Sequence, residues 1–185
     1  DRDGTLREEA DDGGWPVRVA GGRVVVSTDA AFDAVAGDFD GWAGTALTAD
    51  DDFAWTVVPD VAGDAYKLKS GETFAADPWA RAYGYDEFGE ITFVAPPAAA
   101  HLERWPIVDG ADLAPRAVRV WVPAEVPTHV LYVHDGQNLF DPEAFNGGWR
   151  RQESAPPAML LVGIDNTGDR MDEYTHVEDD IGGGD

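Results

Sequence analysis

Three apolar runs in the second half of the chain set the strongest limit on its fold. They are residues 117–123 (AVRVWVP), 128–134 (THVLYVH) and 158–165 (AMLLVGID). Unbroken runs of this kind are typical of strands that are covered on both faces, usually by helices packed on a parallel sheet. We therefore predict that residues 104–185 begin an α/β domain, in which residues 128–134 form a buried strand. Three strands are too few to bury both faces of such a sheet, so we expect only its first part here.

The first half of the chain has a different pattern of short alternating segments bounded by Gly, Asp and Pro. The segments are residues 21–28, 32–39, 53–60, 64–71 and 89–96. Alternation at this spacing predicts an all-β sandwich over residues 21–95. The sequence APPAAA predicts a linker at 96–103. Residues 1–20 open with an acidic stretch that is almost free of apolar side chains, so we expect a flexible N-terminus.

The charge balance limits the partners that this chain can bind. It has 36 acidic and 13 basic residues in 185, a net charge of -23. Such a field repels nucleic acid and anionic lipid, so we expect neither as a partner. The chain has no apolar run of membrane-spanning length, and it has no cysteine for disulfides or thiolate chemistry. Neutral substrates fit this charge, and we expect a secreted or periplasmic protein, with the cytoplasm as the alternative.

Four elements in the first half carry a resemblance to a known module. In order they are the run Gly37 to Trp42 (GDFDGW), the triplet Tyr66-Lys67-Leu68, Phe74, and Asp77-Pro78. With these elements, residues 22–95 resemble the immunoglobulin-like, early-set carbohydrate-binding modules of the glycogen-binding type. The resemblance implies that Trp42, Lys67 and Phe74 hold a glucan, with aromatic rings stacking on sugar and lysine donating to hydroxyls. The alternative is that Trp42 and Phe74 pack against a partner domain and Lys67 is a surface residue.

Three motifs in the second half carry a more specific resemblance. They are Val118 to Pro123 (VRVWVP), Val130 to Phe140 (VLYVHDGQNLF) and Val162 to Tyr174 (VGIDNTGDRMDEY). Residues 104–185 are similar to the esterase family related to esterase D, which includes enterochelin esterase and many acetyl-xylan and feruloyl esterases. The resemblance implies an α/β-hydrolase fold and a serine-type carboxylic ester hydrolase acting on acyl esters, with carbohydrate-linked esters as the expected substrates.

The resemblance also implies roles for individual residues. In α/β-hydrolases one oxyanion-binding N–H comes from the loop after the third strand. Asp135, Gly136 and Gln137 occupy that loop, with the Gln137 N–H as the expected donor and Gly136 allowing a sharp turn. Asn138, Arg170, Glu173 and Tyr174 are expected to shape the substrate pocket or to hold one another. A purely structural Arg170 ion pair is equally open, as is a capping role for Asp135 and Asn138. His134 is expected to be a packed histidine rather than the catalytic base.

The catalytic serine itself has no candidate in this sequence. No G-x-S-x-G motif occurs, and Ser27, Ser70 and Ser154 do not lie at a strand-turn-helix elbow. Between the apolar runs ending at 134 and beginning at 158, the stretch GGWRRQESAPP (residues 147–157) has room for about two helical turns, where members of the family place a longer helical segment. We therefore expect a truncated hydrolase whose nucleophile, acid and base lie in a missing C-terminal part, which would be its partner. The chemistry requires no cofactor, and we predict no metal site.

Other functions fit the sequence less well. LLVGIDNTGD resembles the start of an aspartyl phosphatase motif, but Thr167 replaces the second carboxylate. The acidic runs Asp50–Asp52 and Asp179–Asp180 are weak indications of calcium binding. The main alternative is a non-catalytic carbohydrate-binding or interaction protein with a vestigial hydrolase half. Within the esterase class, a siderophore-type ester is the alternative substrate.

Overall fold

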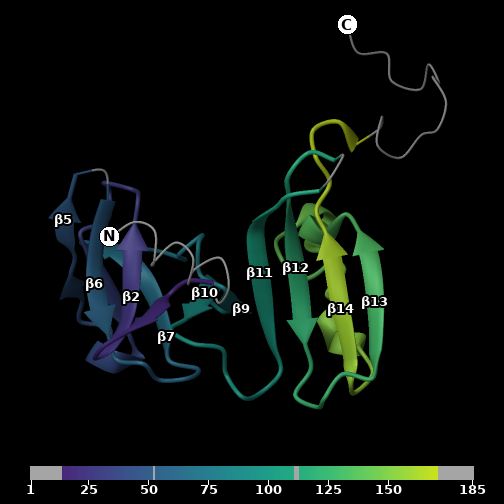
Figure 1. Cartoon of the computed structure of the whole chain (residues 1–185), viewed down its shortest axis with the longest axis horizontal. Helices are drawn as coiled ribbons and strands as arrows, with labels where there is room; N and C mark the ends of the chain where they lie inside the picture. Colours follow the sequence, from purple (N-terminus) through teal and green to yellow (C-terminus); the bar gives the residue numbers. More distant parts are fainter. Residues whose placement is uncertain (1–13, 52, 111–112, 171–185) are drawn as a thin grey trace, which may run out of the picture.

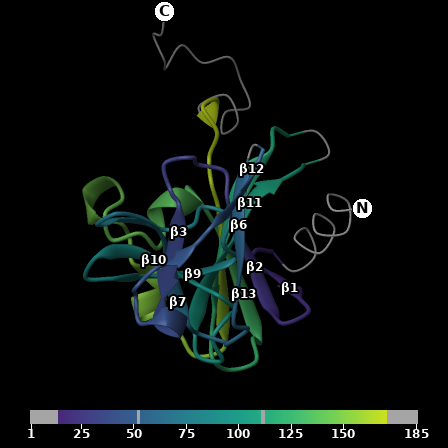
Figure 2. The ribbon, with the colours of Figure 1, turned by 90° about the vertical axis from the view of Figure 1, so that its left-hand side faces the viewer.

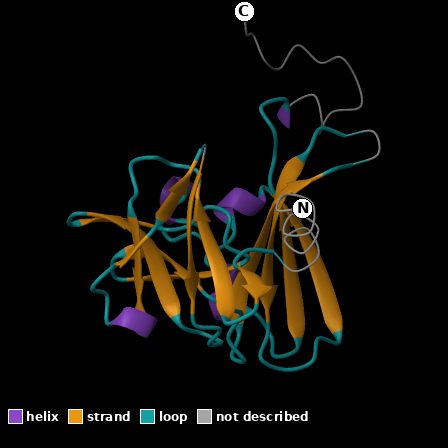
Figure 3. Cartoon of the chain, turned by 60° about the vertical axis from the view of Figure 1, so that its left-hand side comes forward, coloured by secondary structure: helices purple, strands orange, loops and turns teal. Residues whose placement is uncertain are grey.

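The computed structural model describes residues 14–51, 53–110 and 113–170. Within these ranges the chain is mostly β-sheet, with short 3-10 helices in the connections (Figure 3). The strands of the first half are β1 (Val17–Val19), β2 (Gly22–Ser27), β3 (Ala34–Gly37), β4 (Thr45–Ala46), β5 (Thr48–Asp50), β6 (Phe53–Val58), β7 (Ala65–Ser70), β8 (Thr73–Ala75), β9 (Ala82–Asp86) and β10 (Gly89–Phe93). Those of the second half are β11 (His101–Val108), β12 (Arg116–Val122), β13 (His129–His134) and β14 (Met159–Ile164). The 3-10 helices are η1 (Asp38–Asp40), η2 (Gly136–Asn138), η3 (Phe145–Gly147) and η4 (Arg151–Ser154).

The first half is an all-β sandwich, as predicted. One layer is a four-stranded sheet in the order β1-β2-β6-β5, and the other contains β9, β10, β7, β3 and β4 (Figure 2). Val25 and Val58 from the first layer and Val35, Tyr66 and Leu68 from the second form one buried cluster. Each expected alternating segment contains a strand because its apolar positions face this core.

The second half continues the larger sheet of the sandwich. β9 pairs with β11 in antiparallel register, with Leu102 opposite Tyr83, and the sheet goes on through β12 and β14 to β13. In Figure 1 these four strands stand beside the sandwich as one curved surface. β11 and β12 are antiparallel, β12 and β14 are antiparallel, and β13 is parallel to β14. The linker predicted at 96–103 therefore overlaps the start of β11 at His101.

Part of the expected flexible N-terminus is ordered structure. Val17–Val19 form β1, which pairs with β2 through Val17 opposite Val24. Pro16 and Val17 are buried against the sandwich. Residues 1–13, which hold most of the acidic stretch, lie outside the described residues. Among the residues described, no helix is long and apolar enough to cross a membrane.

β13 differs from the buried strand that we predicted. One face of β11 to β14 is covered by the segment after η2, which places Leu139 and Phe140 in a cluster with Leu161 and Tyr83. β13 itself lies at the edge of the sheet, and Val130, Leu131 and Tyr132 are 49%, 49% and 68% exposed. The prediction of burial is wrong for the described residues because no described element lies beside β13 or over its second face.

Candidate functional site at the carboxyl ends of β13 and β14

The chain turns sharply where β13 ends. Asp135 has left-handed backbone angles (φ 58°), and the 3-10 helix η2 follows directly. The Asn138 and Leu139 N–H groups donate to the carbonyls of Asp135 and Gly136, at 2.9 and 3.0 Å. The first N–H groups of a helix have no carbonyl partner within it. Here they belong to Gly136 and Gln137, so the turn presents two backbone donors beyond the end of the strand.

Position 136 requires glycine because neighbouring atoms leave no room for a Cβ, and not because of its backbone angles. A Cβ on Gly136 would lie 2.5 Å from the carbonyl carbon of Gly163 and 2.8 Å from Oδ1 of Asp165. The left-handed residue of the turn is Asp135, not Gly136. The prediction that Gly136 makes the sharp bend is therefore corrected, because glycine serves here to let η2 approach the end of β14.

Asp135 is held by a two-bond ion pair with Arg170. The Arg170 Nε donates to Oδ1 at 2.8 Å, and Nη2 donates to Oδ2 at 2.7 Å. These hydrogen bonds hold the pKa of Asp135 below its usual value. The pair fixes the carboxylate of the left-handed residue and connects the loops after β13 and β14. Glu173 and Tyr174, expected beside Arg170, lie outside the described residues.

Gln137 and Asn166 form a second connection between the same loops. The Gln137 side-chain Nε2 donates to Oδ1 of Asn166, and the Asn166 backbone N–H donates to Oε1 of Gln137 at 3.2 Å. Because both ends of the Gln137 amide are bonded to Asn166, the turn that carries its backbone N–H is positioned independently of any substrate. Asn166 was not among the predicted site residues, although it belongs to the quoted GIDN motif.

A third connection anchors the end of β14. Arg119, on β12, makes two hydrogen bonds from Nε to Asp165 at 3.0 and 3.1 Å and one from Nη2 at 3.0 Å. Asp165 is also the side chain nearest to the absent Cβ of Gly136. Neither Arg119 nor Asp165 was predicted as a site residue. The missed signal is the Arg between Val118 and Val120, in the middle of an apolar run.

The remaining predicted residues of this region have structural contacts. The Asn138 carbonyl accepts from the Trp149 N–H at 2.8 Å, which holds the segment after η2. His134 is exposed at the end of β13, so the expectation of a packed histidine is wrong. Ser27 is buried and bonded to the carbonyl of Asp29, and Ser154 lies in η4. Within the described residues, no cluster of three His, Asp or Glu side chains could hold a metal ion.

The residues predicted to bind glucan are only partly brought together. The rings of Trp42 and Phe74 lie 6.4 Å apart between centroids in an edge-on arrangement. Lys67 is 7% exposed and its Nζ donates to the Phe88 carbonyl at 3.2 Å, so it is neither a partner of these rings nor a surface residue. Lys69, opposite Phe74 in the β7–β8 register, lies over that ring at 5.7 Å instead. The aromatic pair is present, but the lysine beside it is Lys69.

The arrangement can do two things chemically. The turn at Asp135 to Asn138 can donate backbone hydrogen bonds to an oxygen anion, and the Trp42–Phe74 surface can stack on a ring. Comparison of the chain with protein-family models and with curated proteins finds no match.

Proposed function

We propose that this chain is the first part of a serine-type carboxylic ester hydrolase acting on acyl esters, with carbohydrate-linked esters as its substrates. The observation that carries the proposal is the turn Asp135 to Asn138, which is fixed from outside by Arg170 and Asn166. A donor held in place before the reaction costs no reorganisation when negative charge develops on the carbonyl oxygen. The Gln137 N–H has this character, with the Gly136 N–H beside it.

The position of the turn in the sheet supports the same proposal. Counted from β11, the strand before the turn is the third, which is the one that precedes an oxyanion donor in α/β-hydrolases. The order β11-β12-β14-β13 brings the loops after β13 and β14 to one edge. Ligands of open α/β sheets bind at this edge, beyond the carboxyl ends of the strands.

The nucleophile, acid and base belong, in this proposal, to polypeptide outside residues 1–185. The exposed apolar side chains of Val130, Leu131 and Tyr132 support it, because a free edge of this kind suits a further strand and covering helices. The partner is therefore the remaining part of the same hydrolase domain. The proposal includes no cofactor. It also includes that the protein is secreted or periplasmic.

The test compares this chain with the complete product of its gene. A fluorophosphonate probe is expected to label one serine in the complete product and none in residues 1–185. Acetylated xylan, a feruloylated sugar and a catecholate siderophore ester then distinguish the substrates. A complete product without a labelled serine would contradict the esterase and favour a non-catalytic protein with a vestigial hydrolase half.

A second candidate function is glucan binding by the sandwich. It is favoured by the rigidity of Trp42, whose Nε1 donates to Asp38 at 3.0 Å and whose N–H donates to Asp40 at 3.0 Å. Lys69 donates to the Ala43 carbonyl at 2.7 Å and so stays beside Phe74. Electrophoresis in a glycogen-containing gel should show retardation that is lost in Trp42→Ala and Lys69→Met. Trp79→Ala, which removes another exposed aromatic of the sandwich, is the matched control.

A further inference from the structure

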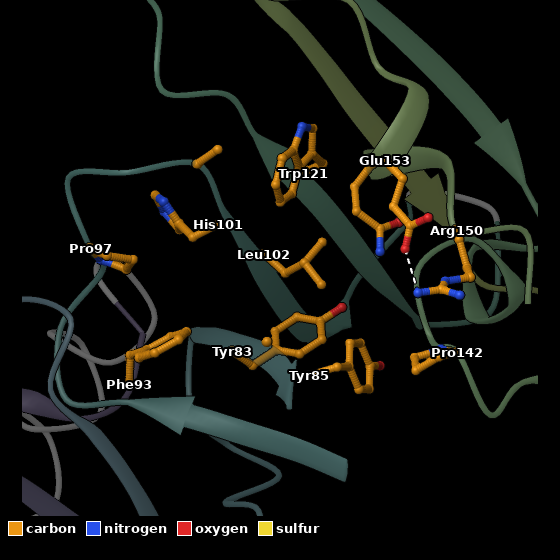
Figure 4. Close-up of a pocket in the computed structure, with 13 residues that line it drawn as sticks. Tyr83, Tyr85, Phe93, Pro97, His101, Leu102, Trp121, Pro142, Arg150 and Glu153 are labelled. Carbon is orange, nitrogen blue, oxygen red and sulfur yellow. Dashed lines mark ion pairs between the residues drawn. The ribbon is translucent and has the colours of Figure 1, made fainter. Parts of the chain in front are cut away.

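A hollow of about 290 Å³ lies where the sandwich meets the second half of the sheet (Figure 4). Tyr85 of β9, Phe93 of β10 and Trp121 of β12 contribute to its walls, and the segment from 142 to 153 closes one side. The volume is near the lower end of the range of small-molecule sites. Residues 134–138 do not line this hollow, and the Trp42–Phe74 surface lies elsewhere on the sandwich.

The walls offer aromatic surface to a ligand. Tyr83 is fully buried, with the Arg104 guanidinium 4.5 Å from its ring centroid. The ring of Tyr85 packs against it edge-on, with 5.9 Å between the two centroids. Tyr85, Phe93 and Trp121 are only partly buried, so their rings are accessible from the hollow. In Figure 4, Tyr83 and Tyr85 lie on one side of the hollow and Trp121 on the other.

The edge of the hollow carries a donor and an acceptor next to each other. Arg150 and Glu153 form an ion pair of 2.6 Å, and their side chains are 56% and 54% exposed. Arg150 has a left-handed backbone (φ 48°), which is unusual for a residue other than glycine. The Arg151 N–H donates to the Leu139 carbonyl at 3.1 Å, which holds this strained position in place.

Two buried polar atoms that line the same region have no hydrogen-bond partner among the described residues. They are the hydroxyl of Tyr83 and Oε1 of Gln152. Burial raises the pKa of Tyr83 to about 12, so its hydroxyl keeps its proton and remains a donor. The Gln152 amide is held by one bond of 3.3 Å, from Nε2 to the Phe140 carbonyl. A ligand hydroxyl that reached these atoms could accept from Tyr83 or donate to Gln152.

We propose that this hollow binds a neutral pyranose ring. A sugar has C–H faces for Tyr85 and Trp121, and its hydroxyls can donate to Glu153 and accept from Arg150. A purely apolar ligand would leave these polar groups without partners, and the net charge of -23 opposes an anion. The inference concerns binding alone and does not rest on ester hydrolysis.

Titration calorimetry and ¹H–¹⁵N spectra of the 185-residue chain test this inference. The probes are methyl β-xylopyranoside, methyl α-glucopyranoside and, as a phenol of similar size, p-cresol. We expect saturable binding of a pyranoside with shifts of the Trp121 indole and the Gln152 side-chain amide. Glu153→Ala should weaken the affinity by about tenfold, the usual effect of losing a hydrogen bond to a charged group.

Two controls locate the ligand. Glu143→Ala removes an exposed carboxylate from the same segment, and Trp42→Ala removes the other aromatic surface; both should leave the affinity unchanged. Tyr83→Phe should weaken binding, because it removes the hydroxyl of a residue that lines the hollow. Absence of saturable pyranoside binding would overturn the inference. Binding of p-cresol alone, or binding lost in Trp42→Ala but retained in Glu153→Ala, would also overturn it.

Discussion

Gly136 and Gly163 lie against each other at the carboxyl ends of β13 and β14. A Cβ on Gly136 would meet the Gly163 carbonyl carbon at 2.5 Å, and one on Gly163 would meet the Gly136 Cα at 3.0 Å. Both neighbours are backbone atoms, which cannot rotate away. The position of the candidate oxyanion turn thus depends on the absence of two side chains.

Replacing Gly136 by alanine should therefore destabilise the fold. Overpacking against backbone costs about 1–3 kcal/mol, and we expect Gly136→Ala to lower the free energy of unfolding by this amount in urea titrations. Gly168→Ala is the matched control, because its Cβ would meet nothing within 4 Å and its φ is not in the left-handed range. Equal stability of the two variants would contradict the close approach.

The Asp135–Arg170 pair predicts a pH-dependent contribution to stability. The folded-state pKa of Asp135 is lowered, so its contribution is present above the unfolded pKa of about 3.9 and is lost as pH falls through the folded value. Asp135→Asn removes the charge while keeping a residue that tolerates φ 58°. We expect the variant to be less stable at pH 7 by about 1 kcal/mol, since Arg170 is partly exposed.

Unfolding of Asp135→Asn and the natural chain should be compared between pH 7 and pH 3. The difference between them should shrink toward the acid end, where the carboxyl of the natural chain also becomes neutral. A difference that stays constant over this range would assign the effect to backbone preference rather than to the ion pair.

The buried pair of Tyr66 and Asp77 predicts the opposite pH dependence. Asp77 is buried, accepts from the Tyr66 hydroxyl at 2.7 Å, and has a pKa that burial raises above its usual value. A raised carboxyl pKa makes the fold most stable below the unfolded pKa, and this stability is lost as pH rises through the folded value. The Tyr66 bond limits that loss by favouring the charged form.

Tyr66→Phe should therefore cost about 1–3 kcal/mol at pH 7, because it leaves a buried carboxylate short of a donor. The cost should decrease as the pH falls and Asp77 becomes protonated in both chains, since burial raises its pKa. Tyr132→Phe, at a 68% exposed position, should change nothing measurable in the same thermal scans. If the loss of stability in Tyr66→Phe did not change with pH, the Tyr66 hydroxyl would contribute through packing alone.

The exposed edge of β13 predicts self-association of the 185-residue chain. Val130 and Tyr132 present apolar surface on the face opposite Leu131, beside an edge with no described neighbour. Sedimentation velocity should show oligomers that increase with protein concentration. Tyr132→Lys should reduce them while changing stability by less than about 0.5 kcal/mol, as at most exposed sites. A natural chain that remains monomeric at high concentration would contradict this expectation.

The strands were predictable where their side chains alternate or run unbroken. β2, β3, β6, β7, β10, β13 and β14 lie within predicted segments, and β12 begins one residue before its segment. β11 was missed because charged side chains stand along it: Arg104 pairs with Glu90 at 2.8 Å across the sheet, and Pro106 interrupts the pattern. β4 and β5 are two and three residues long, which is too short for a period to appear.

The candidate site was predictable within one motif but not between motifs. Asp135 to Asn138 are adjacent in sequence, whereas Arg119 and Asp165 are separated by 46 positions and meet only because β12 pairs with β14. The lysine beside Phe74 is a related case, because Lys67 was expected there and the structure has Lys69. Spacing along the chain does not fix the hairpin register, and that register places Lys69 beside Phe74.

The pairing of β9 with β11 has a consequence for how this protein can be divided. Because Tyr83 and Leu102 sit on neighbouring strands of one sheet, a cut between residues 96 and 103 would strip hydrogen-bond partners from both pieces. The sandwich is thus not a detachable module that could be grafted onto another protein by its sequence boundaries alone. A fusion that uses the sandwich would have to include β11, or another strand that pairs with the same edge of β9.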